Sequence, residues 1–385
     1  MFRSFFHAGF EGATGYNRHR QWIDQIAATQ HDLFVDEDYR RLREIGILTV
    51  REAVRWPLVD KQRRYDFSSV DPFLAAGGRH GIEIIHDLFH FGYPDHIDLF
   101  SADFPARFAD YCFAAASYIA GQTGGKCYFT PVNEPSYFSW AAGEVGLFAP
   151  HAVGRGWELK VRLIEAAIQG INAIRAACPS ARIVNVDPLC RVAVPHGAPE
   201  LRGEVENFNS SVVFQSWDML SGRLLPELGG SPRHLDIVGI NYYWTNQWEW
   251  GSAGVPLAVD DPRRAPLGAL LRSVWERYGN ETVLTETSDL NELRAVWVRE
   301  MAGEVEMLLD EGMPLHGVCL YPILGMPEWH APHEWTQMGL WELAHSDGKL
   351  ERVIHEPMME ALREAQRLEQ HRTRKMALAR HFSPE

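Results

Sequence analysis

Short apolar runs alternate with longer amphipathic segments along the whole chain, and this alternation limits the possible folds more than any other feature. The apolar runs are rich in β-branched and aromatic residues, which favour strands, whereas the segments between them have helical periodicity. Repeated strand–helix units predict a parallel sheet covered by helices. Eight strands are expected, at about 4–10, 47–56, 82–89, 126–132, 182–188, 235–243, 282–287 and 316–324.

Eight strands, each followed by a helix, predict an α/β fold with a single (β/α)8 TIM barrel. A doubly wound open sheet is the rival fold, but no Gly-x-Gly-x-x-Gly follows the first strand and no Walker loop occurs. The sequence has no internal repeat and no low-complexity linker, so we expect one barrel over residues 1–370 and a polar tail over 371–385. Four of the helices are expected at 36–46, 104–124, 157–178 and 293–312.

The net charge of the chain indicates which classes of binding partner are unfavourable. The chain carries 37 Lys and Arg against 51 Asp and Glu, a net charge of −14, which disfavours nucleic acid and anionic membranes as partners. The five cysteines are scattered singly and suggest neither a disulfide framework nor a zinc cage. We find no export signal and no apolar run of the roughly 20 residues that a membrane helix requires, so a cytoplasmic location is expected.

Two acidic residues lie at predicted strand ends far apart in the sequence. Asn133 and Glu134 follow the fourth strand directly before Pro135, and Glu286 lies near the end of the seventh. A closed barrel brings such strand ends together on its active face. Two carboxyl groups across a site are what glycosidic bond cleavage requires, with about 5–5.5 Å between them for retention and about 6.5–9.5 Å for inversion. The alternative interpretation of Asn-Glu-Pro is a turn that caps a helix.

These residues carry a resemblance to a known family. Val-Asn-Glu-Pro at 132–135 resembles the acid/base motif of glycoside hydrolase family 1, the β-glucosidase-like retaining barrels, and Val-Leu-Thr-Glu-Thr-Ser at 283–288 is similar to that family's nucleophile strand. Four further blocks are similar in the same order, at 50–59, 87–94, 238–246 and 317–329. The resemblance implies catalytic roles for Glu134, Glu286, Arg51, Asn133 and Tyr243, and contacts to a carbohydrate substrate from His90, Asn241, Glu328, Trp329, Tyr321 and Glu11.

General physical chemistry is consistent with the roles that the resemblance implies for Glu134, Glu286 and Arg51. A general acid at Glu134 needs a raised pKa, which apolar surroundings and the charge of a nearby Glu286 would supply. Arg51 can hold Glu286 ionised through charge-assisted hydrogen bonds, although an ion pair in the barrel without a catalytic role is the alternative. Such a mechanism needs no cofactor and no metal.

Three differences from the family pattern concern the sugar. The family usually has Gln in a Tyr-Gln-x-Glu-Gly context at the end of the first strand, whereas this chain has Ala-Gly-Phe-Glu-Gly, with Glu11 and no Gln. Tyr321 replaces the usual Trp, and Thr287 and Ser288 replace Asn-Gly after the nucleophile. The chain is also shorter than typical members, which implies an open aglycone side. A transglycosidase or a catalytically silent sugar-binding barrel therefore remains an alternative.

A metal-dependent hydrolase is the rival from another class of enzyme. His86, Asp87, His90, Asp95 and His96 are all metal-ligand types within one short stretch. Strand alternation would place His86 and His90 on one face, where they could share a site. The sequence predicts neither the oligomeric state nor a role for Glu52, which alternation sends to the face opposite Arg51.

Overall fold

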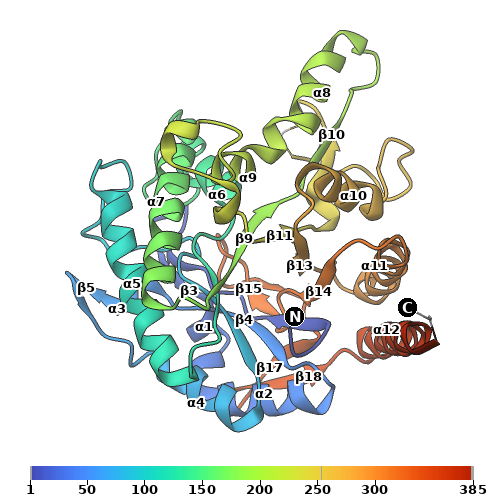
Figure 1. The fold of residues 1–385 in the computed structure, drawn as a ribbon, viewed down its shortest axis with the longest axis horizontal. Coiled ribbons are helices and arrows are strands. Elements are labelled where there is room, and N and C mark those ends of the chain that lie inside the picture. The colour runs from blue at the N-terminus through green and yellow to red at the C-terminus, as the bar shows by residue number, and fades with distance from the viewer. Residues whose placement is uncertain (1, 253, 383–385) are drawn as a thin grey trace.

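Eight parallel strands form a closed barrel at the centre of the structure, a computed structural model that describes residues 2–252 and 254–382 (Figure 1). All eight expected strands are present, and the single (β/α)8 TIM barrel is confirmed. Each strand pairs with its neighbours in the chain order of the barrel, and the last pairs with the first. The strands are β1 (Phe6–Gly9), β4 (Thr49–Ala53), β7 (Glu83–Asp87), β8 (Tyr128–Thr130), β9 (Arg182–Pro188), β11 (Ile237–Asn241), β13 (Glu281–Thr287) and β14 (Leu315–Leu320).

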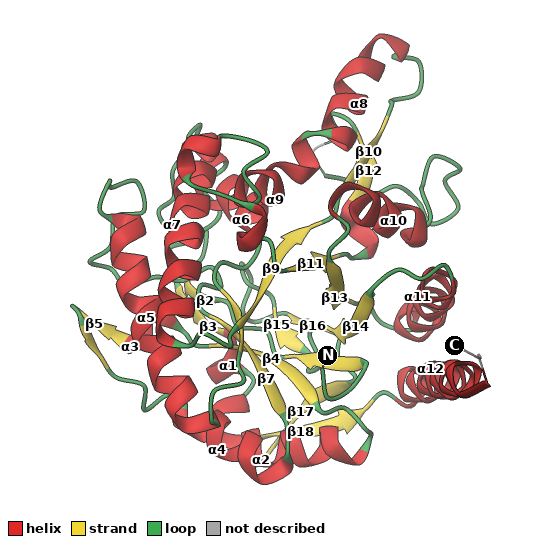
Figure 2. Ribbon diagram, in the orientation of Figure 1, coloured by secondary structure: helices red, strands yellow, loops and turns green. Residues whose placement is uncertain are grey.

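Helices surround the barrel and connect successive strands (Figure 2). The four expected helices are confirmed, and Gly46 and Gly312, which follow the first and last of them, have φ of 79° and 89°, a conformation that glycine adopts freely. Helix α12 continues across residue 370, where we expected the tail to begin. The helices are α2 (His31–Glu44), α4 (Asp71–His80), α5 (Phe104–Thr123), α7 (Gly156–Ala177), α8 (Arg202–Ser210), α9 (Gln215–Leu220), α10 (Leu267–Tyr278), α11 (Leu293–Asp310) and α12 (Glu356–Phe382).

Short helices and strands lie within the loops that connect the barrel elements. The pair β10 and β12, with α8 beside it, projects away from the barrel (Figure 1). The single-turn helices are α1 (Gln25–Ala28), α3 (Trp56–Val59) and α6 (Pro135–Phe138). The short strands are β2 (Thr14–Tyr16), β3 (Trp22–Asp24), β5 (Asp60–Lys61), β6 (Arg64–Tyr65), β10 (Arg191–Ala193), β12 (Gln247–Glu249), β15 (Met326–Pro327), β16 (Trp335–Thr336), β17 (Trp341–Ser346) and β18 (Lys349–Ile354).

Apolar side chains fill both the interior of the barrel and the layer between strands and helices. The inner cluster comes from alternate residues of the strands, so the barrel is a packed core rather than a pore. Its buried members are Ile85, Tyr128, Val184, Val186, Ile237 and Val283. Over the described part of the chain, we find no helix with the length and apolarity needed to cross a membrane.

Candidate active site

The two glutamates singled out from the sequence lie at the carboxyl ends of their strands. Glu134 follows β8 and directly precedes α6, with a φ of 48°. Glu286 lies in β13, one residue before the strand ends, and the parallel register pairs it with Asn241 at the end of β11. Strands β8 and β13 are not neighbours in the barrel, so the closed sheet is what brings the two residues to one site.

Glu134 is largely buried and is held by an amide. Nδ2 of Asn241 donates a hydrogen bond of 2.9 Å to Oε1 of Glu134. Burial, and then the negative charge of Glu286, raise the pKa of Glu134 well above its ordinary value of 4.5. The carboxyl group therefore favours the protonated form that a general acid requires.

Glu286 has a donor on each of its two oxygens. Nη1 of Arg51 donates to Oε1 at 2.9 Å, and the hydroxyl of Tyr243 donates to Oε2 at 2.8 Å. Asn241 and Tyr243 lie two residues apart, so one segment at the end of β11 contacts both glutamates. Donors of this kind stabilise the ionised carboxylate and fix its orientation.

Arg51 is fully buried and organises the centre of the site. Its Nη2 atom donates to Oδ2 of Asp87 at 2.6 Å and to Oδ1 of Asn133 at 3.0 Å, in addition to the bond from Nη1 to Glu286. Burial disfavours the charged form of Asp87, but the charge of Arg51 and the hydrogen bond and charge of His90 together outweigh burial and lower the pKa of that carboxyl group. The sequence pattern suggested Asp87 only as a metal ligand and not in this role, although an aspartate at a strand end is a visible signal.

Three of the predicted sugar-binding residues, His90, Tyr321 and Glu11, lie together near Arg51. Nε2 of His90 lies 3.4 Å from the hydroxyl of Tyr321 and 3.5 Å from Oε1 of Glu11. Nδ1 of His90 lies 3.2 Å from Oδ2 of Asp87, and Nδ2 of Asn133 lies 3.3 Å from Nε2. This group therefore connects through Asp87 and Asn133 to Arg51, which contacts Glu286.

Glu328 and Trp329 lie in the loop after β15, and both are partly buried. The ring of Trp329 packs against Phe91 and Tyr137, with ring centroids 5.8 Å and 6.2 Å apart. Burial, and then the charges of Glu134, Glu11 and Glu328, raise the pKa of Tyr137. The phenol of Tyr137 is thus close to all three carboxyl groups, and the sequence analysis did not single it out.

The expectation that His86 and His90 share one face is wrong. His86 pairs in register with Glu52, which points away from Arg51, and its ring packs on Phe129. Strand β7 ends at Asp87, so the alternation does not extend to His90. Among the described residues, no three His, Cys, Asp or Glu side chains are grouped so that they could hold a metal ion.

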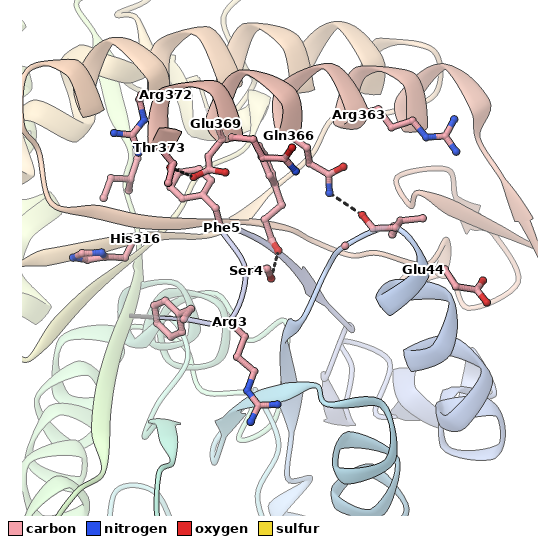
Figure 3. Close-up of a pocket in the computed structure, with 16 residues that line it drawn as sticks. Arg3, Ser4, Phe5, Glu44, His316, Arg363, Gln366, Glu369, Arg372 and Thr373 are labelled. Atoms are coloured by element: carbon pink, nitrogen blue, oxygen red, sulfur yellow. Dashed lines mark hydrogen bonds between the residues drawn. The ribbon is translucent and has the colours of Figure 1, made fainter. Parts of the chain in front are cut away.

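A cavity of about 770 Å³ lies under α12, at the end of the barrel opposite the two glutamates (Figure 3). Arg3, Ser4 and Phe5 line it from below, while Arg363, Gln366 and Glu369 line it from α12 (Figure 3). None of the described residues that line this cavity belongs to the predicted site. The cavity is lined by charged groups of both signs and is distinct from the two glutamates.

The fold and the site define a (β/α)8 barrel with two buried carboxyl groups at its strand ends. No protein-family model matches the chain, and no curated protein sequence matches it. Among solved structures, the β-glucosidase from Thermotoga maritima in complex with noeuromycin is similar, with a TM-score of 0.73 and 15% identity over 95% of this chain and 98% of that chain. The AHE enzyme from Alicyclobacillus herbarius has a TM-score of 0.74 and 16% identity, over 95% and 98% of the two chains. At these identities, the likeness establishes the TIM-barrel fold.

Proposed function

We propose that this protein is a retaining β-glycosidase similar to glycoside hydrolase family 1, acting on a small β-glycoside or oligosaccharide. The observation that carries the proposal is the contrast between the two glutamates. Burial and the charge of Glu286 raise the pKa of Glu134, whereas Arg51 and Tyr243 donate hydrogen bonds to both oxygens of Glu286. A buried acid with a raised pKa beside a carboxyl group that accepts two hydrogen bonds is the pair that a double-displacement glycosidase needs.

In the first step, a carboxylate oxygen of Glu286 attacks the anomeric carbon. The bond between that carbon and the leaving oxygen breaks, and Glu134 gives its proton to the leaving oxygen. In the second step, Glu134 takes a proton from water, and the water oxygen attacks the anomeric carbon and releases Glu286 as a carboxylate. Protons and electron pairs balance over the two steps, so neither a cofactor nor a metal ion is required.

The neighbouring side chains have supporting roles in this proposal. Arg51 and Tyr243 hold the nucleophile in position, and Asn133 hydrogen bonds the 2-hydroxyl, an interaction that strengthens as the ring approaches an oxocarbenium ion. The ring of Trp329 offers an apolar face to the sugar. The hydroxyl groups of the sugar contact His90, Asn241, Tyr321, Glu11 and Glu328.

The thiol groups agree with a cytoplasmic location. All five cysteines are free, and four of them are buried. Proteins that keep unpaired thiols are typical of reducing compartments. We therefore infer that the enzyme works in the cytoplasm on carbohydrate delivered there.

Replacement of the nucleophile tests the proposal. Glu286→Ala should abolish hydrolysis of β-aryl glycosides, and added azide should restore turnover and yield the α-glycosyl azide, which NMR identifies. A panel of β-aryl glycosides that differ in the configuration of each hydroxyl identifies the sugar. Unchanged turnover in Glu286→Ala would remove the assignment, and binding of sugars without release from any glycoside would instead support a silent sugar-binding barrel.

A further inference from the structure

The backbone of Glu134 is in a conformation that residues with a side chain rarely adopt. Its φ of 48° lies in the left-handed region, where Cβ is crowded by the following carbonyl oxygen. The amide of Glu134 donates to the carbonyl of Val186 at 3.0 Å, and its own carbonyl accepts from the amide of Phe138 at 2.9 Å. The direction of the carboxyl group therefore depends on how β9 and the first turn of α6 are held together.

Asp187 joins these two elements next to Glu134. The amide of Ser136 donates to Oδ1 of Asp187 at 2.9 Å, and the hydroxyl of Ser136 donates to Oδ2 at 2.5 Å. The same hydroxyl lies 2.8 Å from the hydroxyl of Ser216 on α9. Both oxygens of a fully buried carboxyl group are thus used to bind the second residue of α6.

Asp187 does not face the reacting atoms. In the parallel register of β9 and β11, Pro188 lies opposite Asn241 and Asp187 lies opposite Ile240. Because side chains alternate along a strand, and Asn241 points into the site to contact Glu134, Asp187 points to the outer side of the barrel. There it lies between the strands and helices α6, α7 and α9.

From this geometry we propose that Asp187 is a positioning residue for the acid/base glutamate: through Ser136 it anchors the first turn of α6 and so keeps the carboxyl group of Glu134 directed at the leaving oxygen. The inference rests on the proposed function, in which Glu134 is the acid. It assigns to Asp187 and Ser136 a role that the strand-end motifs did not suggest.

The charge of Asp187 acts on the same group. Burial raises the pKa of Asp187 to about 6, against the opposing effects of the Ser136 hydrogen bonds and the charge of Lys160 on α7. Above that pH, the negative charge of Asp187 raises the pKa of Glu134, in addition to the effects of burial and of the charge of Glu286. Other groups face this pair from every neighbouring element: Cys190 after β9, Ser216 on α9, Asn241 on β11, Tyr243 after β11, Tyr137 on α6 and Arg51 on β4.

Two substrates with different leaving groups separate positioning from a general loss of structure. A poorly acidic leaving alcohol needs the proton of Glu134, whereas 2,4-dinitrophenolate leaves without it. Asp187→Ala should lower kcat/KM, which reports the step in which the leaving group departs, by about 10- to 100-fold for an alkyl β-glycoside and by about 3-fold at most for the dinitrophenyl glycoside. Ser136→Ala should show the same selectivity to a smaller extent, and it decides the question if Asp187→Ala does not fold.

The pH dependence gives a second readout. Asp187→Asn removes the charge but keeps an acceptor for the amide of Ser136, so the pKa of Glu134 should fall and the alkaline limb of the pH profile of kcat/KM should move to lower pH. Asp218→Asn is the matched control, because Asp218 is a buried carboxylate of α9 bonded to Arg277 and Tyr278 instead. That control should change neither the leaving-group selectivity nor the alkaline limb.

The proposal is overturned if Asp187→Ala, Ser136→Ala and Asp187→Asn all lose activity equally on both substrates, or if none of them loses activity. If the wild-type protein cleaves no β-glycoside, the proposed function fails, and the role of Asp187 is then measured directly. Carbon-13 NMR of the glutamate carboxyl groups, with Glu134→Gln for assignment, reports the pKa of Glu134. A lower pKa in Asp187→Asn supports the coupling between the two residues, whereas an unchanged pKa refutes it.

Discussion

Nε2 of His31 lies 2.9 Å from Oε1 of Glu52, behind the strand whose inner face carries Arg51. The opposite side of the imidazole, Nδ1, lies 2.7 Å from Oδ2 of Asp38, and Nε of Arg352 donates to the other oxygen of Asp38 at 2.7 Å. Glu52, to which the sequence assigned no role, thus belongs to a buried charge network that links β4, α2 and β18. This network supports the strand that holds Arg51.

The His31 network predicts that stability falls in mildly alkaline solution. Burial by itself would lower the pKa of His31, but Glu52 and Asp38 outweigh it and raise the pKa from 6.5 to about 9. Because the folded state binds the proton more tightly, the stabilisation is complete below pH 6.5 and is lost as the pH rises through about 9. We expect the free energy of unfolding to decrease by on the order of 3 kcal/mol over this range, measured by urea unfolding.

His31→Gln should remove most of that pH dependence. His80→Gln is the control, because His80 pairs with Asp36 at an exposed site and its loss should leave the slope intact. A wild-type protein whose unfolding free energy is the same at pH 6.5 and pH 9 would show that His31 is not protonated in the folded state.

The elements that were predictable from the sequence are those with local signals. Eight apolar runs identified the barrel strands because strands buried on both faces need continuous apolar residues. Once a barrel is assumed, the carboxyl ends of its strands meet at one face, which predicted that Glu134, Glu286 and Arg51 lie close together. The alternation of side chains along a strand also predicted that Arg51 and Glu52 point to opposite faces of β4.

The features that were missed depend on where a strand ends and on what packs behind it. His86 and His90 separate because β7 ends at Asp87, a boundary that apolar periodicity cannot locate to within a residue. The role of Asp187 depends on Ser136, which is 51 residues away in the sequence and adjacent only after β8 and β9 have paired and α6 has packed against β9. Tyr137 lacks any local signal, since tyrosine is as common in a core as in a site.

Tyr243 should contribute to catalysis through its hydrogen bond to Glu286, and the chain offers a matched control. Tyr243→Phe removes the donor to Oε2 and should lower kcat/KM by about 10- to 100-fold, since Glu286, the proposed nucleophile, loses orientation and charge stabilisation. Tyr242 is adjacent, but its hydroxyl accepts a hydrogen bond from Gln247. Tyr242→Phe should therefore stay within about 3-fold of wild type, and equal losses in the two variants would contradict the assignment.

Because His86 and His90 lie in different surroundings, their replacement should affect kcat/KM unequally. His90→Gln breaks the contacts with Asp87 and Tyr321 and should lower kcat/KM for aryl glycosides by about 10-fold or more. His86→Gln alters a ring that packs on Phe129 and should change thermal stability rather than kcat/KM. Incubation with EDTA should leave turnover unchanged, and loss of activity that zinc restores would instead favour the metal-dependent alternative.

Gly9 explains why this chain has no glutamine at the end of the first strand. In the Tyr-Gln-x-Glu-Gly pattern, Gly9 stands where Gln would stand, two residues before Glu11. A Cβ atom at Gly9 would lie 1.9 Å from Cδ2 of Tyr321, so the tyrosine ring occupies the space that a larger residue would need. The hydroxyl of that ring accepts a hydrogen bond from the amide of Gly12 and lies near His90.

Gly9→Ala should therefore act through Tyr321. The added methyl group must displace the ring, and we expect a loss of about 1–3 kcal/mol in the free energy of unfolding together with a higher KM. In a Tyr321→Val background, the same change should cost less, and the difference between the two backgrounds measures the coupling. Gly78→Ala is the control, because a Cβ at this exposed helical glycine meets no atom within 4 Å and should stabilise the protein slightly. Additive effects of Gly9→Ala and Tyr321→Val would show that the tyrosine ring does not fill the space over Gly9.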